Sequence, residues 1–474
     1  MNARATPGDS GRVARAPRRA VQQSIPVWPG VCTAALVGAV YLTIASGGTF
    51  RFEPSSFPHH VLIADAWLHG QLNVREAVLQ QRSELYYQRF RAGLEARYRM
   101  QGRRLTEEEW QRIRPTLKTP LMHDWTYVNG KYYGYWGPMP AVLMLPYVAV
   151  AGVNASDRLV SGLLGAGTVL LIFLMLREVA RLGCVPLSAA ACVALAVLFG
   201  LGTVHFYLAV MGQVWFLSQV TAAFFLTLSI WALLRSDRAW GWAALAGAAF
   251  GAALLARNSV VMTGPFVPFA LFGLWRRTAD AGWAWLLRRV LGFGVPLALA
   301  GVVMLAYNQA RFGSPFEDGV RAMLKAGAPQ FRQDYEAHGV FNLYYVPRNA
   351  YYYFLNPLLH RQPPTQAITF DGNGNSMFLV TPALLYVFGA FRRRNWLVTS
   401  AALGAGSSLA MLLCFFGTGW FNFGNRYLLD LMPLAILLIA AGMQGRLTRV
   451  STALITLSVL INSWGTYRFM QEQF

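Results

Sequence analysis

Long apolar segments recur along most of this chain, and they limit the fold more than any other feature. A helix that crosses a bilayer needs about 20 consecutive, mainly apolar residues. Trp28–Ala45 is one such segment. Further segments of about this length follow near 158–176, 185–202, 213–234, 240–256, 259–275, 290–307, 377–391, 396–416, 427–443 and 449–463. The sequence therefore predicts an all-α polytopic membrane protein with about eleven transmembrane helices.

Composition agrees with this class and excludes others. Apolar residues make up 55% of the chain and charged residues only 13%, whereas soluble domains average roughly 25% charged residues. The four cysteines form no Cys-x-x-Cys pair, so a disulfide scaffold is excluded. A soluble multidomain enzyme is not expected.

Basic residues predict how the chain is oriented in the membrane. The net charge of +20 arises from 38 Arg and 3 Lys against 21 acidic residues. Arg and Lys accumulate in short cytoplasmic loops, so this excess needs no nucleic-acid partner. The predicted cytoplasmic segments are the tail 1–26 and the loops around 177–181, 235–238, 276–289, 392–394 and 446–449. We expect a multi-pass protein of the cytoplasmic membrane, with its N-terminus inside and its C-terminus outside.

The rest of the chain, 27–474, is predicted to form a single membrane domain. It includes two large outer loops. The loop 47–157 contains interfacial helices, and its charged part has a Thr-x-x-Glu capping box that starts a helix at Thr106. The loop 308–376 is rich in aromatic residues and proline, which favours an aromatic belt at the interface over a sugar-stacking surface.

Titratable side chains gather on the predicted outer side, where all seven histidines lie. The first group follows the first span. Asp65 interrupts the apolar side of a surface helix, with Glu53, His59 and His60 nearby. A carboxylate beside a low-dielectric surface favours its protonated form, which suits a general base when a partner tunes it. The alternative is a capping or salt-bridging role.

A second group surrounds a predicted hairpin. Asn129-Gly130 is a strong signal for a tight turn between Trp125–Val128 and Lys131–Tyr133. Asp124 and Lys131 flank this turn and are candidate site residues. A purely structural hairpin is the alternative interpretation.

The third group consists of two arginines at membrane edges. Arg257 separates two apolar runs almost without a loop, and Arg426 precedes Tyr427 in a polar break before another run. The forked donors of arginine match a phosphate group, so Arg257 and Arg426 are predicted to bind a phosphate. Tyr427 is a further candidate. Arginines that reach toward lipid headgroups are the alternative.

The order of several short motifs resembles the GT-C glycosyltransferases, in particular the branch of protein O-mannosyltransferases and lipid A aminoarabinose transferases. Ile63–Gly70 is similar to the helix in the family's first outer loop. Tyr135–Pro146, followed by Asp157-Arg158, resembles its proline-rich interfacial helix and the next span. Gly251–Arg257 and Asn425–Pro433 resemble a glycine-led helix with a basic end and an Arg-Tyr-Leu-Leu segment.

The resemblance implies transfer of a sugar, with inversion, from a polyprenyl-phosphate donor to an acceptor outside the membrane of a bacterial cell. In that branch an Asp-Glu pair supplies the base, but Ser55 and Ser56 stand at the matching positions here. The candidate bases are therefore Asp65 first, then Asp124 and Glu53, with His59 beside them. No metal and no other cofactor is expected. The partners are membrane lipids and a glycan, lipid or protein acceptor.

Two other functions fit parts of the sequence. A transporter or a flippase for lipid-linked sugars would explain the number of spans and the interrupted helices. The long outer loops and the scarcity of ionisable residues within the spans argue against it. A non-catalytic assembly partner that binds through its outer loops is the third alternative.

Overall fold

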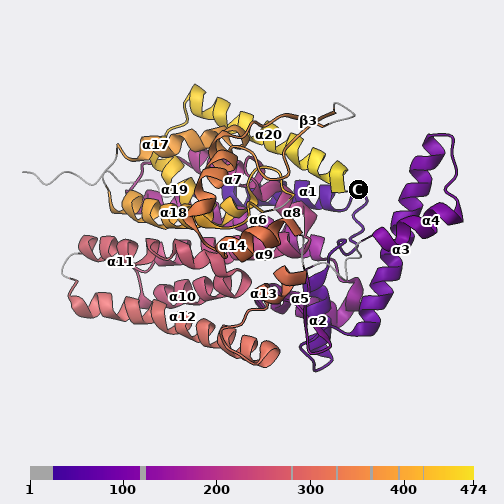
Figure 1. Cartoon of the computed structure of the whole chain (residues 1–474). Coiled ribbons are helices and arrows are strands. Elements are labelled where there is room, and N and C mark those ends of the chain that lie inside the picture. Colours follow the sequence, from indigo (N-terminus) through magenta and orange to yellow (C-terminus); the bar gives the residue numbers. More distant parts are fainter. Residues whose placement is uncertain are drawn as a thin grey trace, which may run out of the picture.

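The structure is a computed structural model, and it describes residues 25–117, 124–278, 281–326, 329–362, 367–392, 395–419 and 421–473. Helices account for almost all regular structure within these ranges (Figure 1). Their bounds in the first half of the chain are α1 (Trp28–Ala45), α2 (His59–Leu68), α3 (Glu76–Met100), α4 (Glu107–Ile113), η1 (Arg114–Thr116), α5 (Met139–Ala151), η2 (Gly152–Asn154), α6 (Asp157–Arg181), α7 (Ala189–Leu201), α8 (His205–Met211), α9 (Val214–Leu234) and α10 (Trp240–Ala256). The later bounds are η3 (Asn258–Thr263), α11 (Phe266–Arg277), α12 (Trp283–Phe312), α13 (Val320–Ala326), α14 (Pro329–His338), η4 (Leu343–Tyr345), α15 (Val346–Ala350), η5 (Tyr351–Leu355), α16 (Met377–Val380), η6 (Pro382–Leu385), α17 (Tyr386–Ala390), α18 (Trp396–Cys414), η7 (Arg426–Asp430), α19 (Met432–Gly442) and α20 (Arg449–Gln473).

The polytopic all-α architecture is confirmed, although fewer helices have full spanning length than expected. Within the described residues, six helices are long and apolar enough to cross a membrane, or seven if α7 and α8, bent by 56°, form one span. The sequence predicted about eleven. Of the other predicted spans, α10 and α19 are shorter apolar helices, the segment 377–391 is broken, and the 25-residue α20 is less apolar.

Proline explains the break within 377–391. Thr381 has φ −131° and ψ 78°, so it leaves the helical region between α16 and η6. Pro382 lacks an amide proton and disfavours a helical conformation at the residue before it. Three short helices, α16, η6 and α17, therefore replace the expected continuous span.

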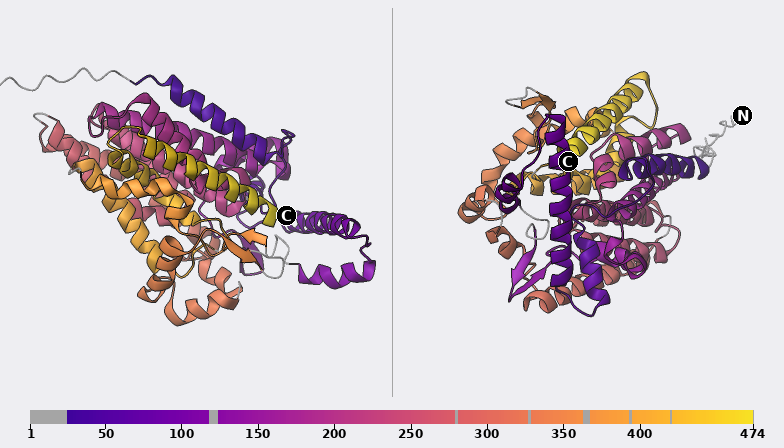
Figure 2. Two further views of the ribbon diagram at one scale, coloured as in Figure 1. Left: turned by 90° about the horizontal axis from the view of Figure 1, so that it is seen from above. Right: turned by 90° about the vertical axis from the view of Figure 1, so that its right-hand side faces the viewer.

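The loops rich in arginine gather at one end of the helical bundle, which we call the basic end. Arg181, at the end of α6, forms ion pairs with Glu178 in the same helix and with Asp237 in the loop after α9. Arg289 of α12 donates to the carbonyl oxygen of Ser236 in that loop. Helix α1 begins at this end, and α20 runs from it to the opposite end (Figure 2). The grouping agrees with the predicted sorting of charge, while the cytoplasmic location of this end stays a prediction.

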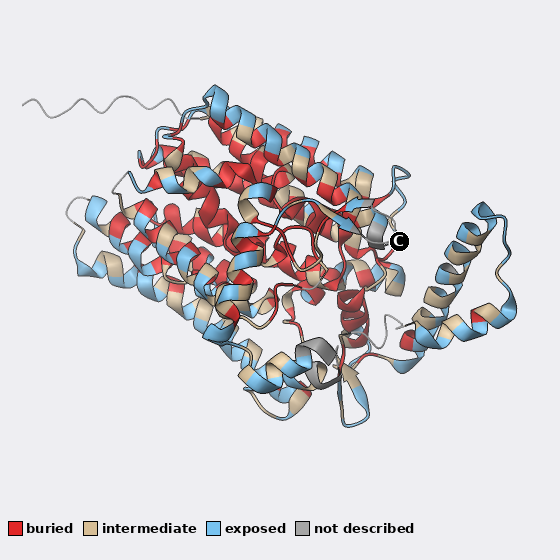
Figure 3. Ribbon diagram, turned by 45° about the horizontal axis from the view of Figure 1, so that its top comes forward, coloured by how far each residue is buried: buried red, intermediate tan, exposed pale blue. Residues whose placement is uncertain are grey.

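The opposite end, which we call the loop end, contains the two large connecting segments. In the first, α3 and α4 form an arm that projects from the bundle, and most of its residues are exposed or half-buried (Figure 3). Glu109 and Thr106 bond reciprocally at the start of α4, which confirms the capping box. Strands β1 (Thr126–Val128) and β2 (Lys131–Tyr133) confirm the hairpin. The predicted tail 1–26 lies outside the described residues except for its last two.

The second connecting segment begins later than predicted. Helix α12 continues to Phe312, so residues 308–312 belong to this helix, not to a loop. The segment then contains α13, α14, η4, α15, η5 and a small hairpin of β3 (His360–Gln362) and β4 (Ala367–Thr369). The bundle beneath is tightly packed around α6, α9 and α19, where most apolar side chains are buried (Figure 3).

Candidate functional site

A cavity of about 490 Å³ lies at the loop end of the bundle. Its walls come from parts of the chain that are far apart in sequence: the turn before α5, the start of α9, the junction of α10 with η3, the segment leading into α13, the end of α18 and the start of η7. The residues that line it are Tyr135, Trp136, Gly137, Trp215, Ser218, Ala256, Arg257, Asn258, Ser259, Val261, Met262, Asp318, Val320, Met323, Val340, Phe341, Met411, Leu412, Phe415, Phe416, Arg426 and Tyr427.

Arg257 enters this cavity from the break between α10 and η3. The residue has an extended backbone, with φ −159° and ψ 114°, because the helix ends at Ala256. Its Nε donates to Oδ2 of Asp430 at 2.8 Å, and the Asp430 side chain is only 1% exposed. The Oγ of Ser259 donates to the same carboxylate oxygen at 2.6 Å.

Arg426 enters the cavity from the first residue of η7. Its Nε donates to the carbonyl oxygen of Gly419 at 2.8 Å, and its backbone amide donates to Oδ1 of Asn422 at 3.0 Å. Gln219 of α9 donates to its carbonyl oxygen at 3.0 Å. These bonds fix the backbone and one edge of the guanidinium group.

The two arginines share one aromatic neighbour. The guanidinium carbon of Arg257 lies 4.7 Å from the ring centre of Tyr427, and that of Arg426 lies 5.1 Å from it. In the described part of the chain, both arginines donate side-chain hydrogen bonds through Nε and none through the Nη groups, so the Nη donors are available to a ligand. The structure thus brings the three candidates Arg257, Arg426 and Tyr427 into one cavity.

Besides Asp430, two carboxylates of the described residues lie in or next to this cavity. Asp318 lines it directly. Asp124 lies behind the wall, where its Oδ2 accepts a hydrogen bond of 2.6 Å from Nε1 of Trp215. Burial, with a contribution from Asp124, raises the pKa of Tyr135 well above its ordinary value, so this phenol stays protonated.

Asp65, the first predicted base, is engaged elsewhere. Its two carboxylate oxygens accept hydrogen bonds from Nε and Nη2 of Arg75, at 2.8 and 2.9 Å. Asp65 is 4% exposed and does not line the cavity. This forked pair ties α2 to the start of α3. Glu53, which also does not line the cavity, accepts through its backbone carbonyl a bond from Ser156 Oγ.

The histidines that follow the first span, His59 and His60, contact residues that line the cavity. The His59 ring stacks on Trp125 at a centroid distance of 4.3 Å and meets the edge of Trp136, which lines the cavity. His60 Nε2 lies 2.8 Å from Ser218 Oγ, another lining residue. Lys131 is exposed in the hairpin and does not reach the cavity.

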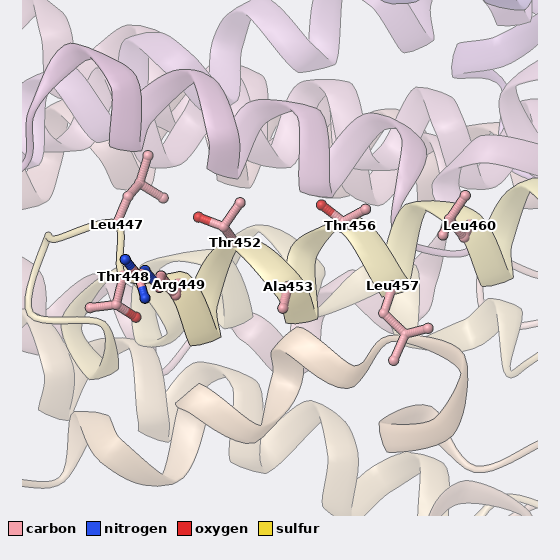
Figure 4. A pocket seen from close by; sticks show the side chains of 8 residues that line it. All are labelled: Leu447, Thr448, Arg449, Thr452, Ala453, Thr456, Leu457 and Leu460. Carbon is pink, nitrogen blue, oxygen red and sulfur yellow. The ribbon is translucent and has the colours of Figure 1, made fainter.

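A second hollow follows the surface of α20 near the basic end (Figure 4). Its only charged lining residue is Arg449, and the others are threonine, leucine and alanine. None of the predicted site residues lines it. Among the described residues, no group of three or more His, Cys, Asp or Glu side chains is arranged to hold a metal ion at either place.

Sequence reasoning missed Asp430, Ser259 and Asp318. Asp430 lies 173 positions after Arg257, so only the fold reveals that pair. Ser259 is two residues from Arg257 in the same polar break, which was an available signal. Asp318 lies in the second connecting segment, next to Glu317 and Gly319, in a stretch without a recognisable motif.

Comparisons with known proteins yield likeness of structure only. No known protein family and no curated protein matches the sequence. The apo oligosaccharyltransferase of Archaeoglobus fulgidus matches with a TM-score of 0.50 and 13% identity, over 94% of this chain and 56% of that one. The oligosaccharyltransferase AglB of the same organism, in complex with an inhibitory peptide and a dolichol-phosphate, gives 0.49 and 13%, over 94% and 55%.

This chain spans little more than half the length of those structures. At 13% identity the match to the apo enzyme is a statement about fold. It extends over nearly the whole chain, in agreement with the polytopic helical architecture that the sequence predicts. In architecture, the chain is a polytopic membrane protein whose fold is similar to that of the apo oligosaccharyltransferase.

Proposed function

We propose that this protein is a membrane glycosyltransferase. It transfers a sugar from a polyprenyl-phosphate donor to an acceptor at the loop end, on the extracytoplasmic side of the cytoplasmic membrane. The fold, similar to that of the apo oligosaccharyltransferase, supports this class, and the arginine-rich basic end supports the orientation. The acceptor is a glycan, a lipid or a protein.

The observation that carries the proposal is the meeting of Arg257 and Arg426 in one cavity. Burying an arginine costs free energy unless the charge is paired. Of these two arginines, Arg257 has a carboxylate partner among the described residues and Arg426 has none. The pair Arg257–Asp430 is neutral, and Arg426 adds a positive charge to the cavity that Asp318 also lines. A bound phosphate would accept bonds from the forks of both arginines.

The proposed reaction is a direct displacement. An acceptor hydroxyl attacks the anomeric carbon of the sugar, and the bond from that carbon to the phosphate oxygen breaks. The two arginines stabilise the phosphate as its charge grows. Attack from the opposite side inverts the anomeric carbon, by the geometry that applies to inverting glycosidases.

A carboxylate must take the proton of the acceptor hydroxyl. We propose Asp318, which lines the cavity, as the first candidate and Asp124 as the second. The forked bonds of Asp65 to Arg75 occupy both carboxylate oxygens. We therefore assign Asp65 a positioning role in the connecting segment.

The proposal is tested by native mass spectrometry of the detergent-purified protein with added undecaprenyl phosphate. The wild type is expected to bind this lipid, and Arg257→Ala combined with Arg426→Ala is expected to lose it. Arg99→Ala, on the exposed arm, is the matched control and should bind normally. Absence of binding to the wild type, or equal binding to the double variant, would refute a donor site in this cavity.

A further inference from the structure

Asp430 is a buried carboxylate that the proposed reaction does not use. It is the last residue of η7, does not line the cavity and is 1% exposed. Its Oδ2 accepts hydrogen bonds from Arg257 Nε and Ser259 Oγ, at 2.8 and 2.6 Å. Its Oδ1 has no hydrogen-bond partner in the described part of the chain.

The bonding differs from that between Arg75 and Asp65, another pair whose carboxylate is buried. Arg75 donates hydrogen bonds from both Nε and Nη2 to Asp65, so this edge of its guanidinium group is fully used by the carboxylate. Arg257 gives only Nε to Asp430, and its side chain keeps 20% exposure at the cavity. The Arg75–Asp65 pair uses two donors of its guanidinium group, whereas the Arg257–Asp430 pair leaves the Nη donors of Arg257 available to another partner.

Tyr427 completes the restraint on Arg257. The guanidinium group lies 4.7 Å from the ring centre, so the ring supports one face of the plane while Asp430 fixes one edge. Ser259 holds the carboxylate from η3. A planar cation restrained at an edge and a face has its remaining donors directed before a ligand arrives, which lowers the entropic cost of binding.

We propose that Asp430, held by Ser259, is a positioning residue that orients Arg257 toward the donor phosphate. This rests on the proposed function of the cavity. It adds that the affinity for phosphate depends on a carboxylate that never touches the ligand.

The direction in which Asp430→Asn changes the affinity for an anionic lipid distinguishes this positioning role from a purely electrostatic one. Asp430→Asn removes a negative charge close to the site. Coulomb attraction alone predicts that an anionic lipid then binds more tightly. Loss of orientation predicts weaker binding, by about tenfold, which is the scale of one charge-assisted hydrogen bond.

The measurement is the affinity for undecaprenyl phosphate, from quenching of tryptophan fluorescence in detergent. Trp136 and Trp215 line the cavity and report its occupation. The variants are Asp430→Asn, Arg257→Gln and the double variant. Ser259→Ala is a milder variant, because it deletes one bond to Asp430 and leaves the ion pair in place.

The expected result is weaker binding by Asp430→Asn and a smaller loss for Ser259→Ala. In the Arg257→Gln background, Asp430→Asn should change the affinity no further, because the residue that it orients is gone. Equal or tighter binding by Asp430→Asn overturns the positioning role, and so does a full additional loss in the double variant.

The same experiment separates failure of the two proposals. If the wild type does not bind the lipid, the proposed function itself fails. If Arg257→Gln weakens binding but both Asp430→Asn and Ser259→Ala bind like the wild type, the donor site stands and only the positioning role is lost. Should Asp430→Asn not fold, as judged by its melting curve, Ser259→Ala decides the question.

Discussion

His60 makes the stability of the loop end depend on pH. The residue is 1% exposed in α2, where Nε2 contacts Ser218 Oγ and the carbonyl oxygen of Val214. Its Nδ1 has no hydrogen-bond partner among the described residues, so a proton added there would meet no acceptor. Burial therefore lowers the pKa of His60 from 6.5 to about 4, against a smaller opposing effect of the Val214 carbonyl.

The direction and size of the effect follow from this lowered pKa. Above pH 6.5 the imidazole is neutral in both the folded and the unfolded chain, and its stabilising contribution is complete. Between pH 6.5 and about 4 only the unfolded chain takes up the proton, so stability is lost as the pH falls. The loss is about 2 kcal/mol at pH 5 and approaches about 3 kcal/mol below pH 4.

The assay is thermal unfolding of the purified protein in detergent, followed by tryptophan fluorescence at pH 7.5 and pH 5.0. The wild type should lose more stability on acidification than His60→Gln, which cannot take up this proton. The matched control is His360→Gln, which changes a histidine of the β3–β4 hairpin and should behave as the wild type does. An equal response of wild type and His60→Gln to acid would refute the reasoning.

Two further predictions concern stability. Arg75→Gln leaves the Asp65 carboxylate buried without its partner and should cost about 3 kcal/mol, seen as a lower melting temperature, whereas a shift below one degree would contradict the pairing. Gly137→Ala should also lower the melting temperature and weaken lipid binding, because its Cβ would lie 2.0 Å from the carbonyl oxygen of Leu255 at the cavity wall. Gly294→Ala in α12 is the control, because its Cβ would have no atom from another described segment within 4 Å, and it should be neutral or slightly stabilising.

Local signals in the sequence were sufficient for local structure. The hairpin at Asn129-Gly130 and the capping box at Thr106 depend on neighbouring residues, and both are confirmed. Full spanning length was harder to predict, because apolar content does not reveal where a helix breaks. Thr381-Pro382 carried that signal within 377–391, but the apolar residues on both sides obscured it.

Sequence reasoning identified the two arginines that line the candidate site, but it did not identify the carboxylate that lines it. Arg257 and Arg426 each interrupt an apolar stretch, where a charge is costly enough to indicate a role. Carboxylates occur throughout the connecting segments, so residue type alone could not distinguish Asp65 from Asp318. The two residues differ in their surroundings. Asp65 is hydrogen-bonded to Arg75, whereas Asp318 lines the cavity.

The two ends of the bundle differ in how they are joined. At the basic end, Arg181 links α6 to the loop after α9, and Arg289 links α12 to the same loop. At the loop end, the same bundle surrounds a cavity whose walls come from many separate segments. We therefore expect the basic end to act as a pivot, so that small rotations of the helices about it widen or narrow the mouth of the cavity. A substrate with a long lipid tail could then enter the cavity from the side of the bundle while the links at the basic end stay intact.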